Sequence, residues 1–236
     1  MIRLDRLLPL DVRRRAALRR APPGPLRDYL AIPFPPRRSD LRRARFLALD
    51  LETTGLDPAR DEIVSAAWVA LEWDAIHLAT AHHELVAPER AMPEASAVLH
   101  GITDDAAARG APLRDVLVEL LAALAGRVLV AHNAPFELAM VDAACMRLLG
   151  GRFVAPAVDT MDLARGWLES RGAPALPGAA SLRLAAVRRR HNLPRYRAHD
   201  ALSDAVAAAE LFLAQVAERE REGGREIPLG NVLARQ

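Results

Sequence analysis

The stretch 46–55 constrains the chain most, because an apolar run ends there in two carboxylates separated by one residue and followed by a turn. In an extended strand successive side chains point to opposite faces, so Asp50 and Glu52 project to the same side. Two carboxylates at one strand end repel each other, and a divalent cation such as Mg²⁺ would remove that repulsion. The pair alone leaves two interpretations open, a metal site or a strand exit with two solvated acids.

Two later segments carry acids in comparable surroundings. Residues 128–131 read as a second buried strand, and Pro135 then opens a helix that holds Glu137 in its first turns. Further on, an apolar-periodic run over 205–216 places Asp204 inside a helix and His199 at or just before its start. The candidate catalytic and metal-binding set is therefore Asp50, Glu52, Glu137, Asp204 and His199.

In these blocks the chain resembles the DnaQ-like, or DEDDh, family of 3′–5′ exonucleases, which includes proofreading subunits of replicative polymerases. The resemblance covers about residues 45–217, and its blocks follow one another in the family's order. The matching residues are Asp50-Leu51-Glu52-Thr53-Thr54-Gly55, His100-Gly101-Ile102-Thr103, His132-Asn133-Ala134-Pro135-Phe136-Glu137, Asp159-Thr160 with Leu163-Ala164-Arg165, and His199 with Asp204.

The resemblance implies a fold, a reaction and a cofactor. The fold is α/β and ribonuclease H-like, with a mixed five-stranded sheet and helices on both faces. The reaction is hydrolysis from the 3′ end of single-stranded DNA, with RNA left open, to nucleoside 5′-monophosphates. It uses two Mg²⁺ or Mn²⁺ ions, with His199 as the general base and Asp50 bridging the two ions. Glu52 and Asp204 would complete the coordination sphere of one ion, and Glu137 would support the second ion.

Glu137 departs from the family, which usually carries aspartate at this position. Glutamate keeps the charge but moves its oxygens roughly 1.5 Å further out. A two-metal site depends on distance, so the substitution bears on the rate more than on metal binding. The alternative function is a catalytically weakened module that binds nucleic acid or a polymerase. Asp142 is a conceivable replacement acid, although it lies five residues further along the helix.

Several residues are candidates for holding the terminal nucleotide. The backbone at the end of the first strand can donate amides, and Gly55 allows close approach. Phe136 can stack on a base or pack in the core. Basic residues just before the last helix can hold phosphates. The substrate-binding candidates are Leu51, Thr53, Thr54, Gly55, His100, Asn133, Phe136, Arg195 and Arg197.

The charge distribution is uneven, although the formal net charge is only +2. All 32 basic residues are arginine, and residues 1–45 carry a net charge of +9 against −7 for the remainder. This division suits a nuclease, because arginines attract phosphate and the acidic residues in the remainder of the chain can hold metal. Residues 1–45 are therefore a basic, proline-containing extension that either contacts nucleic acid or is a solvated segment or a helix packed on the domain.

The periodicities divide the rest of the chain into an exonuclease domain over 46–222 and a mobile tail over 223–236. Strands are expected over 46–51, 62–72, 76–86, 127–131 and just before Asp159. Helices are expected over 93–99, 113–125, 135–149, from Asp159 to about Leu168, and over 181–191 and 200–222.

The sequence also suggests where the protein is located and what it binds. The sequence contains no uninterrupted apolar run of membrane-spanning length, no apolar signal-peptide core and a single cysteine, Cys145, which favours a cytoplasmic protein. Expected partners are a single-stranded nucleic acid 3′ end, with DNA preferred over RNA, a DNA polymerase and a second copy of the chain. The short tail weakly favours a free-standing enzyme.

Overall fold

A computed structural model describes residues 8–90, 93, 96, 100–172, 179–196, 200–223 and 226–234. Its centre is a five-stranded sheet in the order β3-β2-β1-β4-β5. The central β1 pairs antiparallel with β2 and parallel with β4, so the sheet is mixed, as predicted. The strands are β1 (Phe46–Thr53), β2 (Ile63–Leu71), β3 (His82–Leu85), β4 (Val128–Ala131) and β5 (Ala157–Asp159).

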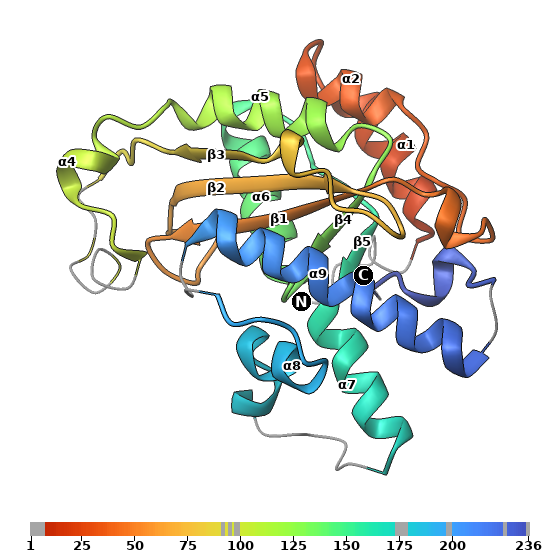
Figure 1. The fold of residues 1–236 in the computed structure, drawn as a ribbon. Helices are drawn as coiled ribbons and strands as arrows, with labels where there is room; N and C mark the ends of the chain where they lie inside the picture. Colours follow the sequence, from red (N-terminus) through yellow and green to blue (C-terminus); the bar gives the residue numbers. More distant parts are fainter. Residues whose placement is uncertain are drawn as a thin grey trace.

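Helices cover both faces of the sheet, which confirms the predicted architecture (Figure 1). Helices α5 and α6 pack on one face and α9 crosses the other. In the part of the chain that is described, no helix is both long and apolar enough to span a bilayer. The helices are α1 (Leu10–Arg20), α2 (Pro25–Ala31), α4 (Asp104–Ala107), α5 (Leu113–Leu124), α6 (Ala134–Leu148), α7 (Thr160–Ser170), α8 (Leu184–Arg190) and α9 (Ala201–Gly223), with 3₁₀ turns at Leu41–Arg43, Leu78–Thr80, Ala179–Leu182 and Leu229–Asn231.

The alternation of side chains along β1 assigns each residue to one of two cores. Leu47, Leu49 and Leu51 join the core under α5 and α6, whereas Phe46 and Ala48 join the core under α9. A strand repeats every two residues, so positions 50 and 52 fall on the α9 face with 46 and 48. This alternation aims both carboxylates of β1 towards α9.

The strand expected over 76–86 is shorter in the structure. A bridge joins Leu71 to Ile76, and a 3₁₀ turn then occupies Leu78–Thr80. The hydroxyl of Thr80 accepts the N–H of Ala70 at 2.9 Å, so a side chain replaces the backbone partner that a longer strand would supply. The expected helix over 93–99 lies outside the described residues, except for positions 93 and 96.

The N-terminal segment forms helices that pack on the domain, which was one of the alternatives for residues 1–45. Leu26, Tyr29 and Leu30 of α2 are buried in the same core as α5 and α6. The Tyr29 hydroxyl donates to the carbonyl of Val154 at 3.0 Å, and its ring stacks on Phe153. Helices α1 and α2 lie at the end of the sheet away from the carboxyl end of β1 (Figure 1). The segment therefore shares the core of the domain.

The C-terminal segment was expected to be mobile, but residues 226–234 are packed. Leu229 and Val232 are buried in the α9 core. Leu41 donates its N–H to the carbonyl of Ile227 at 2.9 Å, and Ala234 donates to Ala157 at 2.8 Å. The sequence missed this because the few apolar residues of a short tail do not show what they pack against.

A core substitution tests whether the N-terminal helices belong to the domain. Leu30 is fully buried, so Leu30→Ala is expected to lower the free energy of unfolding by about 2–5 kcal/mol in urea titrations. The matched control is Leu8→Ala, because Leu8 is 48% exposed and should have almost no effect. Equal midpoints for the two variants would show that α2 is dispensable.

Candidate active site

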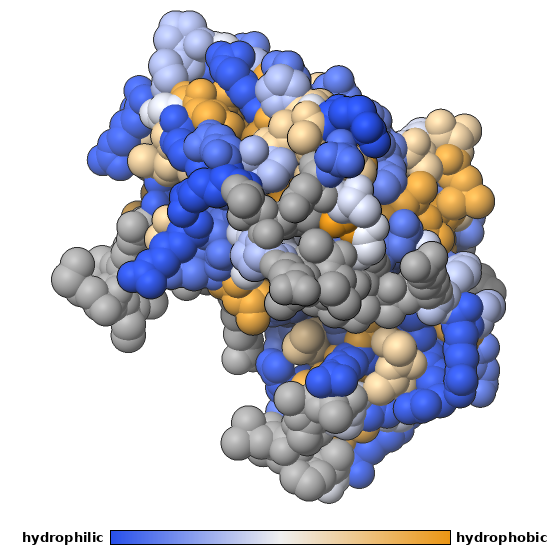
Figure 2. All heavy atoms as spheres, turned by 90° about the vertical axis from the view of Figure 1, so that its left-hand side faces the viewer, coloured by the Kyte–Doolittle hydropathy of each residue, from blue (hydrophilic) through white to orange (hydrophobic). Residues whose placement is uncertain are grey.

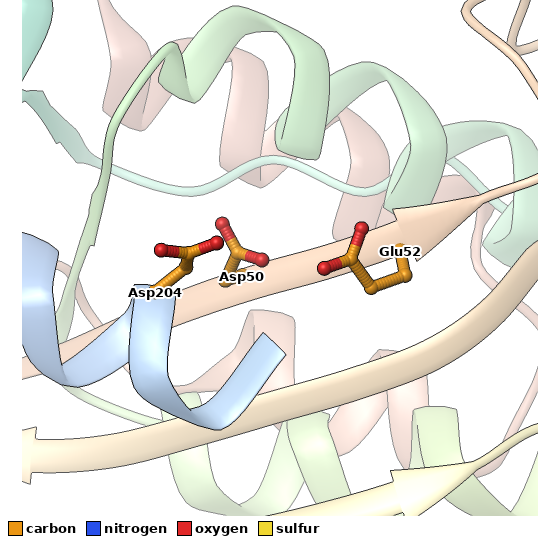
Figure 3. A group of neighbouring side chains, drawn as sticks. All are labelled: Asp50, Glu52 and Asp204. Atoms are coloured by element: carbon orange, nitrogen blue, oxygen red, sulfur yellow. The ribbon is translucent and has the colours of Figure 1, made fainter. Parts of the chain in front are cut away.

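Three carboxylates from two distant segments meet at the carboxyl end of β1. Asp50 and Glu52 come from β1, and Asp204 comes from the first turn of α9 (Figure 3). One oxygen of each lies within 4.8 Å of the others. Carboxylate oxygens at such separations can share a hard divalent cation. The structure therefore brings together three of the four acids in the candidate set.

The start of α9 explains how Asp204 reaches this position. Asp200 accepts the N–H of Ser203 on its side chain at 2.8 Å and that of Asp204 on its carbonyl at 2.9 Å, so it caps the helix. Alanines at 205, 207, 208 and 209 are buried and allow the helix to approach the sheet closely. Asp200 was not among the predicted site residues, although its charge raises the pKa of Asp50.

Glu137, the fourth acid, enters from α6. The turn before this helix places Asn133 at φ 87°, a left-handed conformation that asparagine tolerates well. Asp159 accepts the N–H groups of Asn133 and Met161 at 3.0 Å each, which joins the starts of α6 and α7. Glu137 is 4% exposed, and its buried Oε2 has no hydrogen-bond partner within the described residues. An unpaired buried carboxylate oxygen is a position that suits a cation.

The electrostatics of the cluster also fit a bound cation. Burial holds the pKa of Asp50 well above its usual range, and the charges of Glu137, Glu52, Asp204 and Asp200 raise it further. Burial likewise raises the pKa of Glu137, with an added contribution from Asp159. Like charges crowded in a partly buried site disfavour ionisation, and a divalent cation reverses that effect. The residues present therefore fit divalent metal ions.

His100 contacts one of these carboxylates directly. Its Nδ1 lies 2.5 Å from Oε2 of Glu52, and its Nε2 lies 3.1 Å from the carbonyl of Thr53. The hydrogen bond to Glu52 raises the pKa of His100 above its usual value. His100 thus orients a candidate metal ligand, a more specific arrangement than the pocket-shaping role expected from the sequence.

The loop after β1 uses several of its polar groups internally. The N–H of Thr54 donates to the carbonyl of Glu62 at 2.9 Å, so this amide is already engaged. Thr53 donates its hydroxyl to the carbonyl of Gly55 at 2.7 Å. A Cβ at Gly55 would lie 2.5 Å from the carboxylate of Asp61. The glycine is therefore needed for the close approach of Asp61, whereas the sequence analysis assigned that approach to the nucleotide.

The remaining substrate candidates differ in their exposure. Phe136 is half-buried against the core, and Asn133 and Arg195 are exposed. His199 and Arg197 lie outside the described residues. Leu56, which did not figure among the predicted site residues, is 82% exposed beside Gly55.

Asp142 does not replace the family aspartate. Its Oδ1 accepts the N–H of Phe153 at 2.9 Å, and its Oδ2 lies 2.8 Å from the guanidinium of Arg152. Both contacts tie the middle of α6 to the segment before β5. Asp142 thus has a structural role, and Glu137 is the acid that α6 brings to the cluster.

Known proteins match this chain at the level of sequence. The sequence profile of the exonuclease family RNase_T matches residues 47–212. A DNA polymerase III subunit epsilon-like protein of Rhodobacter capsulatus is 35% identical over 177 residues, which are 73% of this chain and 24% of that protein. A PolC-type DNA polymerase III of Thermotoga petrophila is 33% identical over 175 residues, or 74% of this chain. The chain spans only 12% of that polymerase.

Solved structures share the fold. The nuclease domain of 3′hExo, a DEDDh family member bound to rAMP, superposes with a TM-score of 0.62 at 16% identity. That match covers 80% of this chain and 98% of the nuclease domain. Exonuclease I superposes with a TM-score of 0.62 at 17% identity, over 75% of this chain and 41% of the other.

Proposed function

Because this chain belongs to the DEDDh family of 3′–5′ exonucleases, we propose that it is a metal-dependent enzyme that removes nucleotides from the 3′ end of single-stranded DNA. The products would be nucleoside 5′-monophosphates. The observation that carries the proposal is the convergence of Asp50, Glu52 and Asp204 within 4.8 Å, with the buried Glu137 beside them.

The four acids would hold two Mg²⁺ or Mn²⁺ ions. Asp50 would contact both, Glu52 and Asp204 would complete one coordination sphere, and Glu137 would support the other. When bound, such ions polarise the attacking water and stabilise the departing 3′ oxygen. His100 would keep the carboxylate of Glu52 oriented, since ligands are held in place by their own hydrogen-bond partners.

His199 would accept the proton of the attacking water, because an imidazole with an ordinary pKa of about 6.5 can serve as a base at neutral pH. Arg195 and Arg197 would hold phosphates of the strand. Phe136 is half-buried in the first turn of α6 and Leu56 is exposed three residues after β1, so Phe136 could stack on a base and Leu56 could insert between two bases.

The names of the relatives favour DNA as substrate and a polymerase as partner, and RNA remains a second candidate. A homodimer and a cytoplasmic location complete the proposal. On the face that forms the left-hand side of Figure 1, hydrophilic residues are the more numerous among those coloured, with hydrophobic patches between them (Figure 2).

A degradation assay tests the proposal. The full chain is incubated with 5′-labelled single-stranded DNA, mismatched duplex DNA or short RNA, with Mg²⁺, Mn²⁺ or a chelator. Stepwise shortening that needs the metal and releases 5′-monophosphates is expected with single-stranded DNA. If no substrate is shortened with either metal, the enzyme proposal fails and the alternative of a binding module, which Glu137 favours, replaces it.

Substitutions at Glu137 test whether this carboxylate belongs to the site. Glu137→Asp restores the family's usual acid and is expected to preserve or raise the rate of cleavage. Glu137→Gln keeps the shape and removes the charge, so the rate should fall by about 10–100-fold. Initial rates at saturating Mg²⁺ measure both. A glutamine variant as active as the unmodified chain would remove Glu137 from the mechanism.

A further inference from the structure

A pocket opens on the side of the sheet that α6 covers, and Asp50, Glu52, Glu137 and Asp204 do not line it. Its volume is about 210 Å³. One ordered water needs only about 10–15 Å³ of space, so the pocket can hold an organic ligand. Its walls are residues 58–63, which lead into β2, together with Arg90, Leu113 at the start of α5, and one face of α6 with Met140, Ala143, Ala144 and Arg147.

A buried carboxylate lies in the wall of this pocket. Glu62 is 5% exposed, and its Oε2 accepts the N–H of Glu89 at 2.8 Å. Its Oε1 is also buried and, among the described residues, accepts no hydrogen bond. Arg90 places Nε 3.1 Å from Oε1 without the alignment of a hydrogen bond. A ligand N–H that displaced Arg90 from this oxygen would give it an aligned donor.

Three arginines line the pocket, together with the carboxylate of Asp61, which accepts hydrogen bonds from Thr54 and Asp57. Arg60 and Arg90 have side chains that are 85% and 69% exposed, and Arg147 is 42% exposed. The contact of Arg60 with Asp57 measures 3.6 Å and that of Arg147 with Glu89 measures 3.9 Å, both longer than a hydrogen bond. Weak surface pairs of this kind exchange readily, so these guanidinium groups can turn towards a phosphate.

The pocket adjoins the candidate nucleotide site. Met140 lies four residues after Phe136 on α6, so both occupy one face of the helix. The N–H of Thr54 bonds the carbonyl of Glu62, which ties the pocket wall to the end of β1. Ile63 and Met140 supply apolar surface within the pocket. A matching ligand would have a flat ring for the apolar surface, an edge with N–H donors for the carboxylate of Glu62, and a phosphate for the arginines.

We propose that this pocket binds a guanine nucleotide, with the N1–H and 2-amino donors of the base on Glu62 and the phosphate on the arginines. A carboxylate accepts two neighbouring N–H donors, and among the common bases guanine presents such a pair on its Watson–Crick edge. The nucleotide is either part of a strand bound at the active site or a free mononucleotide. The strand form rests on the proposed exonuclease function, whereas the free form does not.

Calorimetric titration with GMP, in chelator so that the acidic cluster binds no metal, tests the pocket directly. Saturable binding is expected. IMP lacks the 2-amino group and guanosine lacks the phosphate, so each should bind at least about tenfold more weakly. Glu62→Gln should cause a similar loss. Met140→Trp should fill the pocket and abolish binding, whereas Met146→Trp, at a position 46% exposed and outside the pocket, should leave binding unchanged.

A second arm separates the two sources of the nucleotide. DNA strands with one guanine, placed at successive distances from the 3′ end, are digested alongside strands that carry hypoxanthine there. A change in KM at one position that disappears with hypoxanthine and with Glu62→Gln identifies a strand nucleotide. GMP binding without such a change identifies the free nucleotide. Thermal melting of each variant shows that it is folded.

The proposal is overturned if GMP and IMP bind equally or not at all and guanine position has no effect. These results are independent of the exonuclease proposal. If the chain binds GMP in the chelator but shortens no strand, the pocket proposal stands and the exonuclease proposal fails. If the chain shortens strands with no preference for guanine and binds no GMP, the exonuclease proposal stands and the pocket proposal fails.

Discussion

Asp50→Asn is expected to lower the rate of strand cleavage on the order of 10³-fold or more, because it removes the carboxylate proposed to contact both ions. The same change should stabilise the metal-free protein. The folded state raises the pKa of Asp50 through burial and through the charges of Glu137, Glu52, Asp204 and Asp200. A group whose folded pKa is raised destabilises the folded state once pH exceeds its unfolded pKa, about 3.9 for aspartate.

Melting temperatures in chelator check the second effect. As pH rises from about 4, the unfolded chain loses the Asp50 proton first, so the unmodified protein loses stability relative to the variant. The melting temperature of Asp50→Asn should therefore exceed that of the unmodified chain, by more at pH 8 than at pH 5. Added Mg²⁺ should raise the melting temperature of the unmodified chain and have little effect on the variant.

Asp115→Asn is the matched control, because Asp115 is exposed in the first turn of α5. It should lower the stability slightly, through the helix dipole, and leave cleavage intact. Substantial cleavage by Asp50→Asn, or a melting temperature below that of the unmodified chain, would mean that the cluster does not hold metal as proposed.

Arg188→Met is expected to lower the free energy of unfolding by about 2–4 kcal/mol, because it leaves buried partners without their cation. The guanidinium of Arg188, on α8, is 3% exposed and donates to the carbonyls of Ala207 and Pro194 at 2.6 and 2.9 Å. It also lies 2.7 Å from Glu210, whose other oxygen accepts the hydroxyl of Tyr196 at 2.8 Å. The cost falls below that of a fully buried pair because Glu210 is 26% exposed.

Chemical denaturation and cleavage assays at a temperature where the variant is folded measure the two consequences. Residues 194–196 lead in the sequence to His199, so loosening them from α9 should also slow cleavage. Arg189→Met, one residue further on and exposed, is the control that should change neither quantity. If the two variants behave alike, the buried guanidinium does not anchor this segment.

The parts of the fold that the sequence predicted are those that follow from local periodicity. The two-residue repeat of β1 was enough to place Asp50 and Glu52 on one face, and the structure confirms a five-stranded mixed sheet with helices on both sides. Pro135 and the apolar run after Asp204 located the starts of α6 and α9 to within a residue or two.

What the sequence could not predict depends on contacts between distant segments. The arginine-rich composition of residues 1–45 obscured three residues of α2 that fill the core, Leu26, Tyr29 and Leu30. Glycine is needed at position 55 because the carboxylate of Asp61, six residues away, packs against it, and no local sequence pattern predicts this contact. Likewise, nothing in the sequence around Glu62 shows that one of its oxygens is buried beside an arginine that is not aligned to donate a hydrogen bond to it.

The contact between the segment before β1 and the segment after α9 has a practical consequence for how this protein can be shortened. Residues 39–41 and 227–229 are joined by hydrogen bonds and by a bridge between Asp40 and Pro228, and Arg42 pairs with Glu220 nearby. A fragment cut at residue 45 or at residue 223 would break this closure and uncover apolar surface under α9. Truncations for crystallisation or display should therefore retain both closing segments, even though the carboxylates lie on 50–204.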